Sequence, residues 1–598
     1  MDFASIPLFN ELTDEQKVRL SKISQQENIA GGSVLMYEGE PSDALYYVIS
    51  GRFVVTIESQ PTWHSELRAG QSIGEIGFLS GEPRTATVTA IRDAIVLKLS
   101  RDRFEELCKD FPEILNDLCA SLARKLAATT QSSGVAPQEL PRTIAICPAG
   151  ISDIHNFDIQ LQQTLSKLGK TRILKQAEIE QQFPGKDIGS GQIIEWLYQL
   201  EQENDFLLYV VDGGASDWSA ISLRQADLVV LVGQTDNPNS EQNTALNESE
   251  KLVYNLHKPQ AVHLALVRRE QQQILPSSTW LANRPLNLHH HVQHNSVSDL
   301  DRLGRFITGQ ARGFIASGGG AYTAAHVGVI RAMQEEGIDF DFVGGASGGA
   351  AMSAALAMKD ISMDELSNQI QKIFVDSGVM RKFTLPVFSI LDHTAFDKSL
   401  RAAYGDRNIE DLPIPFFAQS TSLTTGEPVV HRSGSLWKAI RASSSIPGLL
   451  PPVTLDDGEI LVDGGILDNI PVETMKTIKS GPNLVVCFEP KHETRVVDSY
   501  ESLPDRKKLI LNLITLNRKK LPNLPKIGSV LTQSMLLNNN SLDKVEDDDV
   551  ILQLTLPKNI RLNDWQHHKM ITEQGYKLTK EWLRQTENVR ILKNFKHQ

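Results

Sequence analysis

The chain has 598 residues and a formal net charge of −13. A chain of this length is too long for one hydrophobic core, so we expect several domains. The negative charge argues against nonspecific binding to nucleic acid, which needs a basic surface, and we predict no nucleic-acid partner. The four cysteines lack the spacing of a zinc site or of a disulfide framework, which predicts a cytoplasmic protein with buried thiols.

Nothing in the sequence predicts a secretory signal or a membrane-spanning helix. The N-terminal stretch MDFASIPLFNELTDEQ has no basic region followed by an apolar run. No run of about 18 apolar residues occurs elsewhere in the chain. We therefore expect a cytoplasmic protein, peripheral to the membrane if it acts on lipid.

Residues 1–128 predict an N-terminal domain built as a β-roll with flanking helices. Short β-rich runs, such as ALYYVISGRFVVTI, are separated by turn signals. Apolar side chains then recur at helical spacing over residues 103–126, which predicts a helix. The run TTQSSGVAPQELP has no apolar periodicity and predicts a linker.

The stretch IGEIGFLSGEPRTATVTA in this domain resembles the phosphate-binding cassette of cyclic-nucleotide-binding domains. The planar guanidinium of Arg84 suits a cyclic phosphate, and Glu75 would accept a hydrogen bond from the ribose 2′-OH. Backbone amides near Gly74 and Thr85 would add donors. The hydroxyl of Thr85 favours cGMP, and cAMP fits nearly as well. The alternative is a β-roll that has kept its shape and lost its ligand.

Residues 141–310 predict a small, Rossmann-like α/β domain. Four apolar runs suggest buried parallel strands between helical segments: RTIAICPAG, DFLLYVVDGG, ADLVVLVG and AVHLALVRR. No GxxxxGK[ST] pattern follows any of them, which argues against a P-loop nucleotidase.

Four histidines near the end of this region could bind a metal: His289, His290, His291 and His294. The favoured interpretation is an edge strand or loop with partly exposed imidazoles. We therefore predict no metal site.

The chemistry is expected in residues 311–598. The stretch DFVGGASGGAAMSAALAMK predicts a strand, a tight turn and a helix of small residues. Its Gly345-Ala346-Ser347-Gly348-Gly349 is a GxSxG sequence, in which Ser347 would be a nucleophile on a strained turn. The neighbouring helix N-terminus would favour developing negative charge. Because GxSxG also occurs in ordinary turns, the strand–turn–helix context carries the prediction.

Two other glycine-rich turns could complete this site. In GFIASGGGAYTAAHVGVIRAM, Gly318, Gly319 and Gly320 let backbone amides approach a ligand, as an oxyanion hole requires. A phosphate loop or a plain turn is the alternative, and the spacing is not the GxGxxG of a dinucleotide loop. In GEILVDGGILDNIPV, Asp463 ends a strand and would be a general base if burial raised its pKa. An ordinary Asp-Gly turn explains this spacing equally well.

In this order, the three motifs resemble the patatin-like phospholipases over about residues 312–475. LWKAIRASSSIPGLLPPV followed by DGGILDNIPV resembles the neuropathy-target-esterase branch more narrowly. The resemblance implies a three-layer α/β/α hydrolase domain in which Ser347 attacks an ester carbonyl and Asp463 takes its proton. It also implies an oxyanion hole at the Gly-rich loop, phospholipid or lysophospholipid substrates, and no cofactor or metal for catalysis.

The Gly-rich loop departs from the family pattern of four glycines, alanine, a basic residue and glycine. Ser317 stands at the first glycine, Tyr322 at the basic residue and Thr323 at the last glycine. Loss of the basic residue would weaken loop orientation or headgroup contact. A catalytically weak, lipid- or nucleotide-binding regulatory protein therefore stays an alternative. His326 aligns with a family histidine that we expect to be structural.

Two expectations concern regulation and membranes. A cyclic nucleotide bound to the N-terminal domain would bias hydrolase activity through the helix at 103–126 and the linker. The run LILNLITLN, flanked by the basic residues 506–508 and 518–520, could lie on anionic lipid. The favoured alternative for that run is a core helix with solvated lysines.

Overall fold

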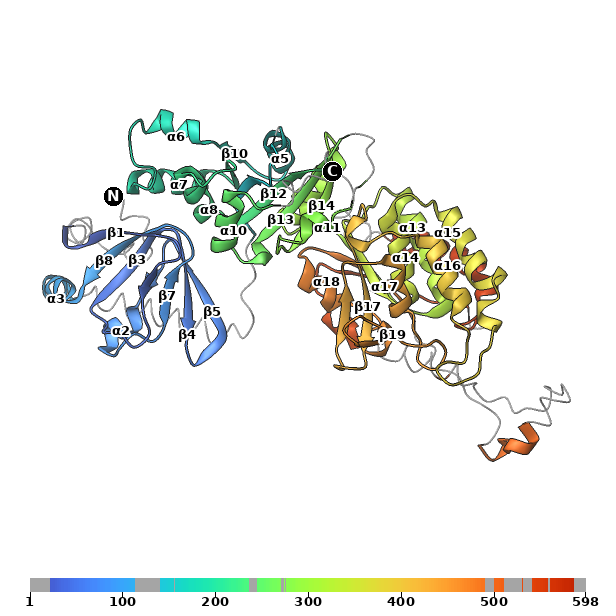
Figure 1. Cartoon of the computed structure of the whole chain (residues 1–598). Coiled ribbons are helices and arrows are strands. Elements are labelled where there is room, and N and C mark those ends of the chain that lie inside the picture. The colour runs from blue at the N-terminus through green and yellow to red at the C-terminus, as the bar shows by residue number, and fades with distance from the viewer. Residues whose placement is uncertain are drawn as a thin grey trace. The chain divides into compact units, whose positions relative to one another are not determined.

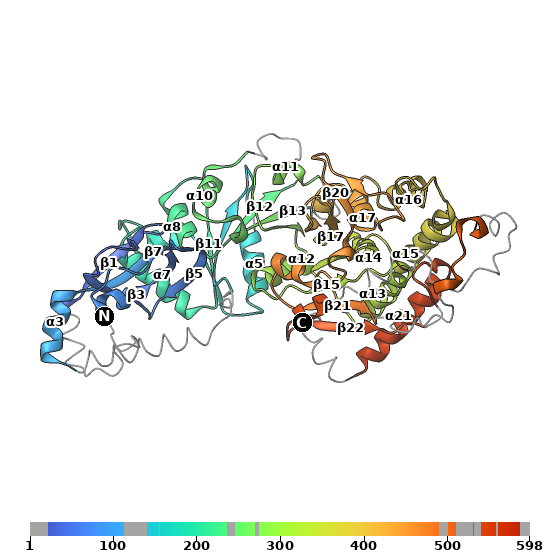
Figure 2. The ribbon, with the colours of Figure 1, turned by 90° about the horizontal axis from the view of Figure 1, so that it is seen from below.

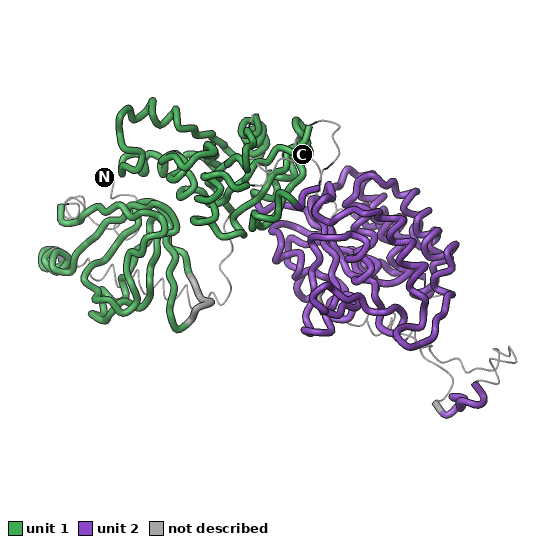
Figure 3. Tube along the Cα trace, in the orientation of Figure 1, with its two compact units in different colours: residues 1–271, 279–307 green, residues 272–278, 308–598 purple. Residues whose placement is uncertain are grey.

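The computed structural model describes residues 22–112, 140–154, 156–235, 245–269, 274, 276–489, 500–509, 530, 540–557 and 560–585. The chain divides into two compact units, coloured separately in Figure 3. Unit 1 comprises residues 1–271 and 279–307, and unit 2 comprises residues 272–278 and 308–598. None of the described helices combines the length and hydropathy needed to cross a bilayer.

Unit 1 begins with two four-stranded antiparallel sheets, drawn in blue in Figure 1. The first has the order β1-β8-β3-β6 and the second β2-β7-β4-β5. Their strands are β1 (Gln25–Ile29), β2 (Val34–Met36), β3 (Ala44–Ser50), β4 (Arg52–Ile57), β5 (Gln60–Arg68), β6 (Ser72–Ile73), β7 (Thr87–Ala90) and β8 (Ala94–Ser100). Two helices accompany them, α2 (Glu75–Ser80) and α3 (Arg101–Asp110).

Strand β3 is buried on both faces, which explains its nearly continuous apolar sequence. Tyr46 and Val48 face the core between the sheets. Leu45 and Tyr47 point the other way, into a cluster formed with residues of α2 and α3. The helix predicted over 103–126 is observed as α3 from Arg101 to Asp110, and the predicted range beyond residue 112 lies outside the described residues.

The second part of unit 1 is a six-stranded sheet with the order β10-β11-β9-β12-β13-β14, in which every pair is parallel. Its strands are β9 (Thr143–Pro148), β10 (Thr171–Leu174), β11 (Phe206–Val210), β12 (Leu228–Gln234), β13 (Val262–Arg268) and β14 (Leu288–Gln293). Its helices are α5 (Phe157–Leu165), α6 (Gln176–Gln182), α7 (Gly191–Glu203), α8 (Asp217–Gln225), α10 (Glu248–Leu256), α11 (Ser278–Leu281) and α12 (Val297–Ile307).

Helices cover both faces of this sheet, as parallel strands require. Ile144 and Ile146 of β9 face a cluster that includes α5 and α12. Ala145 and Cys147 face the opposite cluster, which includes α7, α8 and α10.

The structure corrects the expectation that the histidines at 289–291 and 294 are partly exposed. They lie on or after the edge strand β14, as the favoured interpretation required, but His290 and His291 are buried. His290 Nε2 lies 2.9 Å from Nδ1 of the buried His263, and burial lowers the pKa of both imidazoles. No group of three or more metal-ligating side chains occurs among the described residues.

Ion pairs join the two parts of unit 1. Arg92 Nη2 lies 2.9 Å from Glu201 Oε1, and both side chains are buried. Arg52 pairs with Asp227 at 2.8 Å. Asp93 pairs with Arg224 at 2.7 Å. The β-roll is therefore fixed to α7, to α8 and to Asp227 between α8 and β12. Breaking one of these pairs would leave a buried charge without its partner, which is costly.

Unit 2 is built on a sheet with the order β19-β20-β17-β16-β15-β21-β22, and β18 pairs with β17. The five strands from β17 to β22 in this order are parallel, whereas β18 and β20 run antiparallel to β17. The strands are β15 (Gly313–Ala316), β16 (Phe342–Ala346), β17 (Phe416–Ser422), β18 (Pro428–His431), β19 (Val453–Thr454), β20 (Ile460–Asp463), β21 (Asn483–Phe488) and β22 (Val550–Leu554).

The helices of unit 2 are α13 (Ala324–Glu335), α14 (Gly348–Met358), α15 (Met363–Ile370), α16 (Thr394–Tyr404), α17 (Leu436–Ser443), α18 (Val472–Ile478) and α21 (His568–Leu583). The C-terminal helix α21 lies along α13, as Figure 2 shows, and Thr572 donates a hydrogen bond to the carbonyl oxygen of Ala324. A β-rich N-terminal module followed by α/β regions with parallel strands confirms the predicted fold class. The exact limits of the three predicted domains stay a prediction.

Candidate functional site

Ser347 lies on the sharp turn between β16 and α14. Its φ of 53° and ψ of −131° are unusual for a residue with a side chain, a conformation that costs about 1–3 kcal/mol. A Cβ on Gly349 would lie 2.2 Å from the carbonyl oxygen of Ala316, so only glycine lets the turn pass this close to β15. The packing therefore holds the serine at the end of a buried strand, where the residue is 8% exposed.

Asp463 lies at the end of β20 and is hydrogen-bonded directly to this serine. Ser347 Oγ donates to Asp463 Oδ2 at 2.7 Å, and the amide of Gly465 donates to Oδ1 at 2.9 Å. Complete burial raises the pKa of the Asp463 carboxyl to about 7, although both hydrogen bonds oppose the shift. Near neutral pH this carboxylate can accept a proton from the hydroxyl without an intervening histidine.

The end of α17 and the residues just after it hold the backbone of both members of this pair, a role that the sequence did not reveal. The amide of Ser347 donates to Ser443 Oγ at 2.8 Å, and Ser443 Oγ donates to the carbonyl oxygen of Gln419 at 2.6 Å. The amide of Asp463 donates to the carbonyl oxygen of Ser445 at 3.0 Å. Ser443 and Ser445 belong to the run ASSSIPG, but nothing in the spacing of that run predicts these contacts.

The Gly-rich loop lies beside the nucleophile. A Cβ on Gly318 would be 2.9 Å from the Cβ of Ser347, and the amide of Gly318 donates to the carbonyl oxygen of Asn469 at 3.3 Å. The amides of Gly319 and Gly320 find no acceptor among the described residues. Two such amides in a loop that adjoins a buried serine at Gly318 offer donors for an oxyanion. Asn469 is a further residue that the sequence analysis missed.

The residues that depart from the family pattern anchor this loop. The Tyr322 hydroxyl donates to the carbonyl oxygen of Ile560 at 2.8 Å, and its ring meets Phe488 edge-on with centroids 5.8 Å apart. Thr323 Oγ1 donates to the carbonyl oxygen of Gly320 at 2.7 Å. The loop thus gains a tether to the segment before α21 in place of a basic side chain.

The side chain of His326 makes its hydrogen bond outside the pair formed by Ser347 and Asp463. Its Nε2 lies 2.9 Å from the carbonyl oxygen of Ser317, so the neutral ring donates there, and burial lowers its pKa to about 4. The ring packs against Phe488 with centroids 5.1 Å apart. These contacts agree with the structural role expected for it.

The structure brings together Arg84 and Gly74, two of the four predicted nucleotide-binding residues. Arg84 Nη1 donates to the carbonyl oxygen of Gly74 at 3.1 Å, and Nη2 donates to that of Ala44 at 2.6 Å. Gly74 has a φ of 80°, and a Cβ there would lie 2.2 Å from Arg84 Nη1. Glu75 is buried at the start of α2, whereas Thr85 is exposed beside Arg84.

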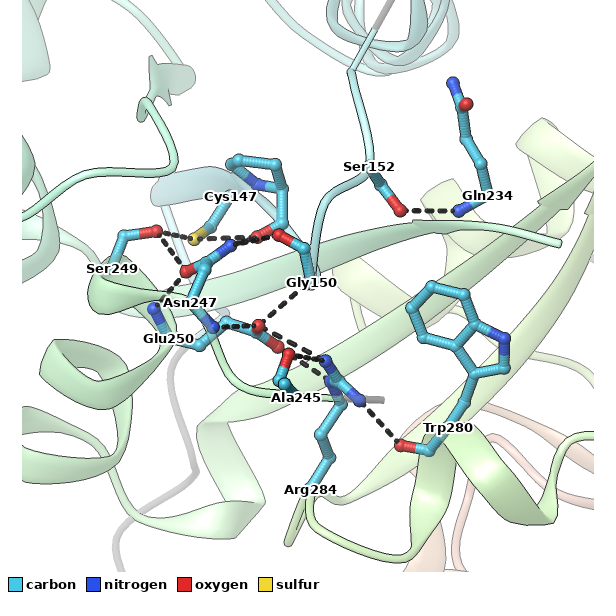
Figure 4. Close-up of polar contacts among 11 residues, drawn as sticks. Cys147, Gly150, Ser152, Gln234, Ala245, Asn247, Ser249, Glu250, Trp280 and Arg284 are labelled. Carbon is cyan, nitrogen blue, oxygen red and sulfur yellow. Dashed lines mark hydrogen bonds and ion pairs between the residues drawn. The ribbon is translucent and has the colours of Figure 1, made fainter. Parts of the chain in front are cut away.

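The loop after β9, where a P-loop would hold phosphate, is occupied by an internal carboxylate. Figure 4 shows that Glu250 accepts hydrogen bonds from the amides of Gly150 and Asn247, at 2.8 and 2.9 Å. Arg284 Nε lies 2.7 Å from Glu250 Oε1, and both side chains are fully buried. Nearby, the amide of Gln234 donates to Ser152 Oγ at 2.9 Å. The amide of Gly150, which could otherwise bind an anion, is therefore already paired with Glu250. Arg284 balances the charge of that carboxylate.

The predicted membrane segment is described only in part. Arg506, Lys507 and Lys508 are exposed, and residues 510–529, which hold most of the apolar run and the second basic group, lie outside the described residues.

Three family models match the chain. Residues 26–111 match the cyclic nucleotide-binding domain. Residues 141–328 match the P-loop like domain of the Neuropathy Target Esterase family. Residues 315–476 match the patatin-like phospholipases.

The relatives agree with these models. An uncharacterized NTE family protein of Mycobacterium tuberculosis is 31% identical over 491 residues, which cover 81% of this chain and 79% of that protein. Lysophospholipase NTE1 of Mycosarcoma maydis is 29% identical, over 75% of this chain and 28% of its own. Among solved structures, the N-terminal domain of a Streptomyces coelicolor transcriptional regulator is 30% identical, covers 22% of this chain and 95% of its own, and has a TM-score of 0.19. The chain therefore belongs to the neuropathy target esterase family of patatin-like phospholipases and carries a cyclic nucleotide-binding domain.

Proposed function

We propose that this chain hydrolyses carboxylic ester bonds of phospholipids or lysophospholipids, with Ser347 as nucleophile and Asp463 as general base. The observation that carries the proposal is the 2.7 Å hydrogen bond from Ser347 Oγ, on a strained turn, to a fully buried carboxylate. The patatin-like model over residues 315–476 and a relative named as a lysophospholipase support the substrate class.

The reaction would proceed through an acyl-enzyme. Ser347 Oγ attacks the ester carbonyl carbon while its proton passes to Asp463 Oδ2. The amides of Gly319 and Gly320 donate to the oxyanion of the tetrahedral intermediate. Asp463 then returns the proton to the departing alkoxide, and the C–O bond of the ester breaks. Water attacks the acyl-serine with Asp463 again as base, which releases the fatty acid and restores the serine.

We further propose that the β-roll binds a cyclic nucleotide and regulates hydrolysis. Arg84 is buried against Gly74 and Ala44 with its guanidinium positioned by backbone carbonyls, and the buried Glu75 follows Gly74 in the chain. A cyclic phosphate would have to compete for this guanidinium, so its binding would move the turn at Gly74. The ion pairs of Arg52, Arg92 and Asp93 offer a route for that movement into the α/β part of unit 1.

Removing either member of the catalytic pair should abolish hydrolysis of both a lysophospholipid and a short-chain p-nitrophenyl ester. Ser347→Ala should lower kcat/KM by roughly a thousandfold or more because it removes the nucleophile. Asp463→Asn should lower it roughly 10²- to 10⁴-fold because the amide cannot take the proton. Asp456→Asn, the same substitution in the exposed turn before β20, is the matched control and should retain full activity. Wild type no faster than Ser347→Ala would favour the catalytically weak, lipid- or nucleotide-binding alternative.

The pH profile should follow the titration of Asp463. Only the ionised carboxylate can act as base, and its pKa of about 7 predicts that kcat/KM falls about tenfold per pH unit below neutrality and levels off above it. The measurement is hydrolysis of the soluble ester from pH 5 to 9. A profile that is level down to pH 5 would show that the group is already ionised there and would contradict the raised pKa.

Arg84→Lys should weaken cyclic nucleotide binding by about tenfold or more, because an ammonium cannot reproduce the planar, bidentate contact with a phosphate. Titration calorimetry with cAMP and with cGMP measures the Kd, and Arg103→Lys on the exposed side of α3 is the control. Saturating nucleotide should also change the rate of ester hydrolysis by wild type. Equal rates with and without nucleotide would reject the regulation, and no binding by wild type would reject the ligand.

A further inference from the structure

Residues 381–388 form an apolar loop that projects into solvent. The loop begins at Arg381, the last residue of the short helix η6 (Val379–Arg381), and reads RKFTLPVF; each of its residues is exposed. Phe383, Leu385, Val387 and Phe388 are 72%, 81%, 75% and 81% exposed. No other large apolar side chain in the described ranges exceeds 65%. Four such side chains in eight residues are too concentrated to be the scattered apolar groups of an ordinary surface.

Backbone hydrogen bonds close the base of this loop. Phe383 and Leu391 pair as an antiparallel bridge. The amide of Thr384 donates to the carbonyl oxygen of Ile390 at 3.1 Å, and that of Asp392 donates to Lys382 at 2.9 Å. The loop is therefore a closed hairpin-like projection that presents its apolar side chains outward.

The base of the loop is joined to the segment that holds the catalytic pair. The amides of Ile390 and Leu391 donate to the carbonyl oxygens of Gly448 and Leu449 at 2.9 and 3.0 Å. The same segment begins with Ser443 and Ser445, which accept hydrogen bonds from the amides of Ser347 and Asp463. The loop is thus connected to the candidate active site through the residues from Ser443 to Leu449.

Charge identifies the partner. Arg381 and Lys382 are exposed and immediately precede the apolar tip. Basic side chains behind an apolar tip match a bilayer surface, where anionic headgroups lie outside the acyl region. The chain as a whole carries a net charge of −13, so contact with an anionic surface depends on such a local basic group.

We infer that residues 381–388 dock the protein on a phospholipid bilayer, with the apolar side chains inserted and Arg381 and Lys382 on the headgroups. The inference rests on the proposed function, since a bilayer is where a phospholipid or lysophospholipid ester would be met. It places membrane contact on a segment other than the basic–apolar–basic run around 506–520.

The test is co-sedimentation of the full chain with phosphatidylcholine vesicles, with and without phosphatidylglycerol. Leu385→Asp/Phe388→Asp should weaken vesicle binding by about tenfold or more, because charged side chains do not enter the acyl region. Arg381→Glu/Lys382→Glu should remove only the additional binding that phosphatidylglycerol confers. Val297→Asp, which changes a residue 62% exposed at the start of α12, is the matched control and should bind as wild type does.

Hydrolysis of the soluble p-nitrophenyl ester shows whether each variant is folded, because that substrate needs no bilayer. A Leu385→Asp/Phe388→Asp protein that sediments like wild type would overturn the inference. So would a change in its oligomeric state with unchanged vesicle binding, which would assign the loop to a second copy of the chain. If wild type cleaves no ester but needs the loop to bind vesicles, the proposed hydrolase fails and the docking surface stands.

Discussion

The hydrogen bond between Ser347 and the buried carboxyl of Asp463 is the interaction on which the account depends. A carboxylate in water would be a weak base at neutral pH, and a serine hydroxyl would be a weak nucleophile. Burial of Asp463 changes this by raising its pKa to about 7. A pKa raised above that of the unfolded chain means that this group's contribution to stability is present below about pH 4 and is lost as pH rises towards 7. The ionised form that the reaction needs is therefore the form that the fold stabilises least.

Such an arrangement persists only if the surroundings fix it. Ser347 is held in a strained backbone conformation by the close approach of Gly349 to β15 and by the hydrogen bond to Ser443. The Gly-rich loop is held by Tyr322, whose hydroxyl reaches Ile560. These supports come from segments far apart in the chain, so the site is complete only when the C-terminal part of unit 2 has packed.

Local patterns in the sequence predicted the parts of the site but not their supports. The strand, turn and helix around Ser347 could be predicted because glycine spacing and small residues dictate that geometry locally. The roles of Ser443, Asn469 and Tyr322 could not, since their partners are set by strand order and have no periodic signature. His290 and His291 were expected to be partly exposed, and their burial follows from helices that cover both faces of a parallel sheet. The apolar composition of the run FTLPVF is typical of a core segment, and only the structure shows that its side chains face solvent.

Labelling with a fluorophosphonate probe tests the central claim most directly, because the probe reacts only with an activated serine and needs no knowledge of the substrate. The account predicts that wild type is labelled on the peptide that contains Ser347. It also predicts that labelling slows below pH 7, and that Ser347→Ala and Asp463→Asn are labelled negligibly although folded. A folded wild type that stays unlabelled, or that is labelled at another serine, would contradict the assignment of Ser347 and Asp463 as the reacting pair.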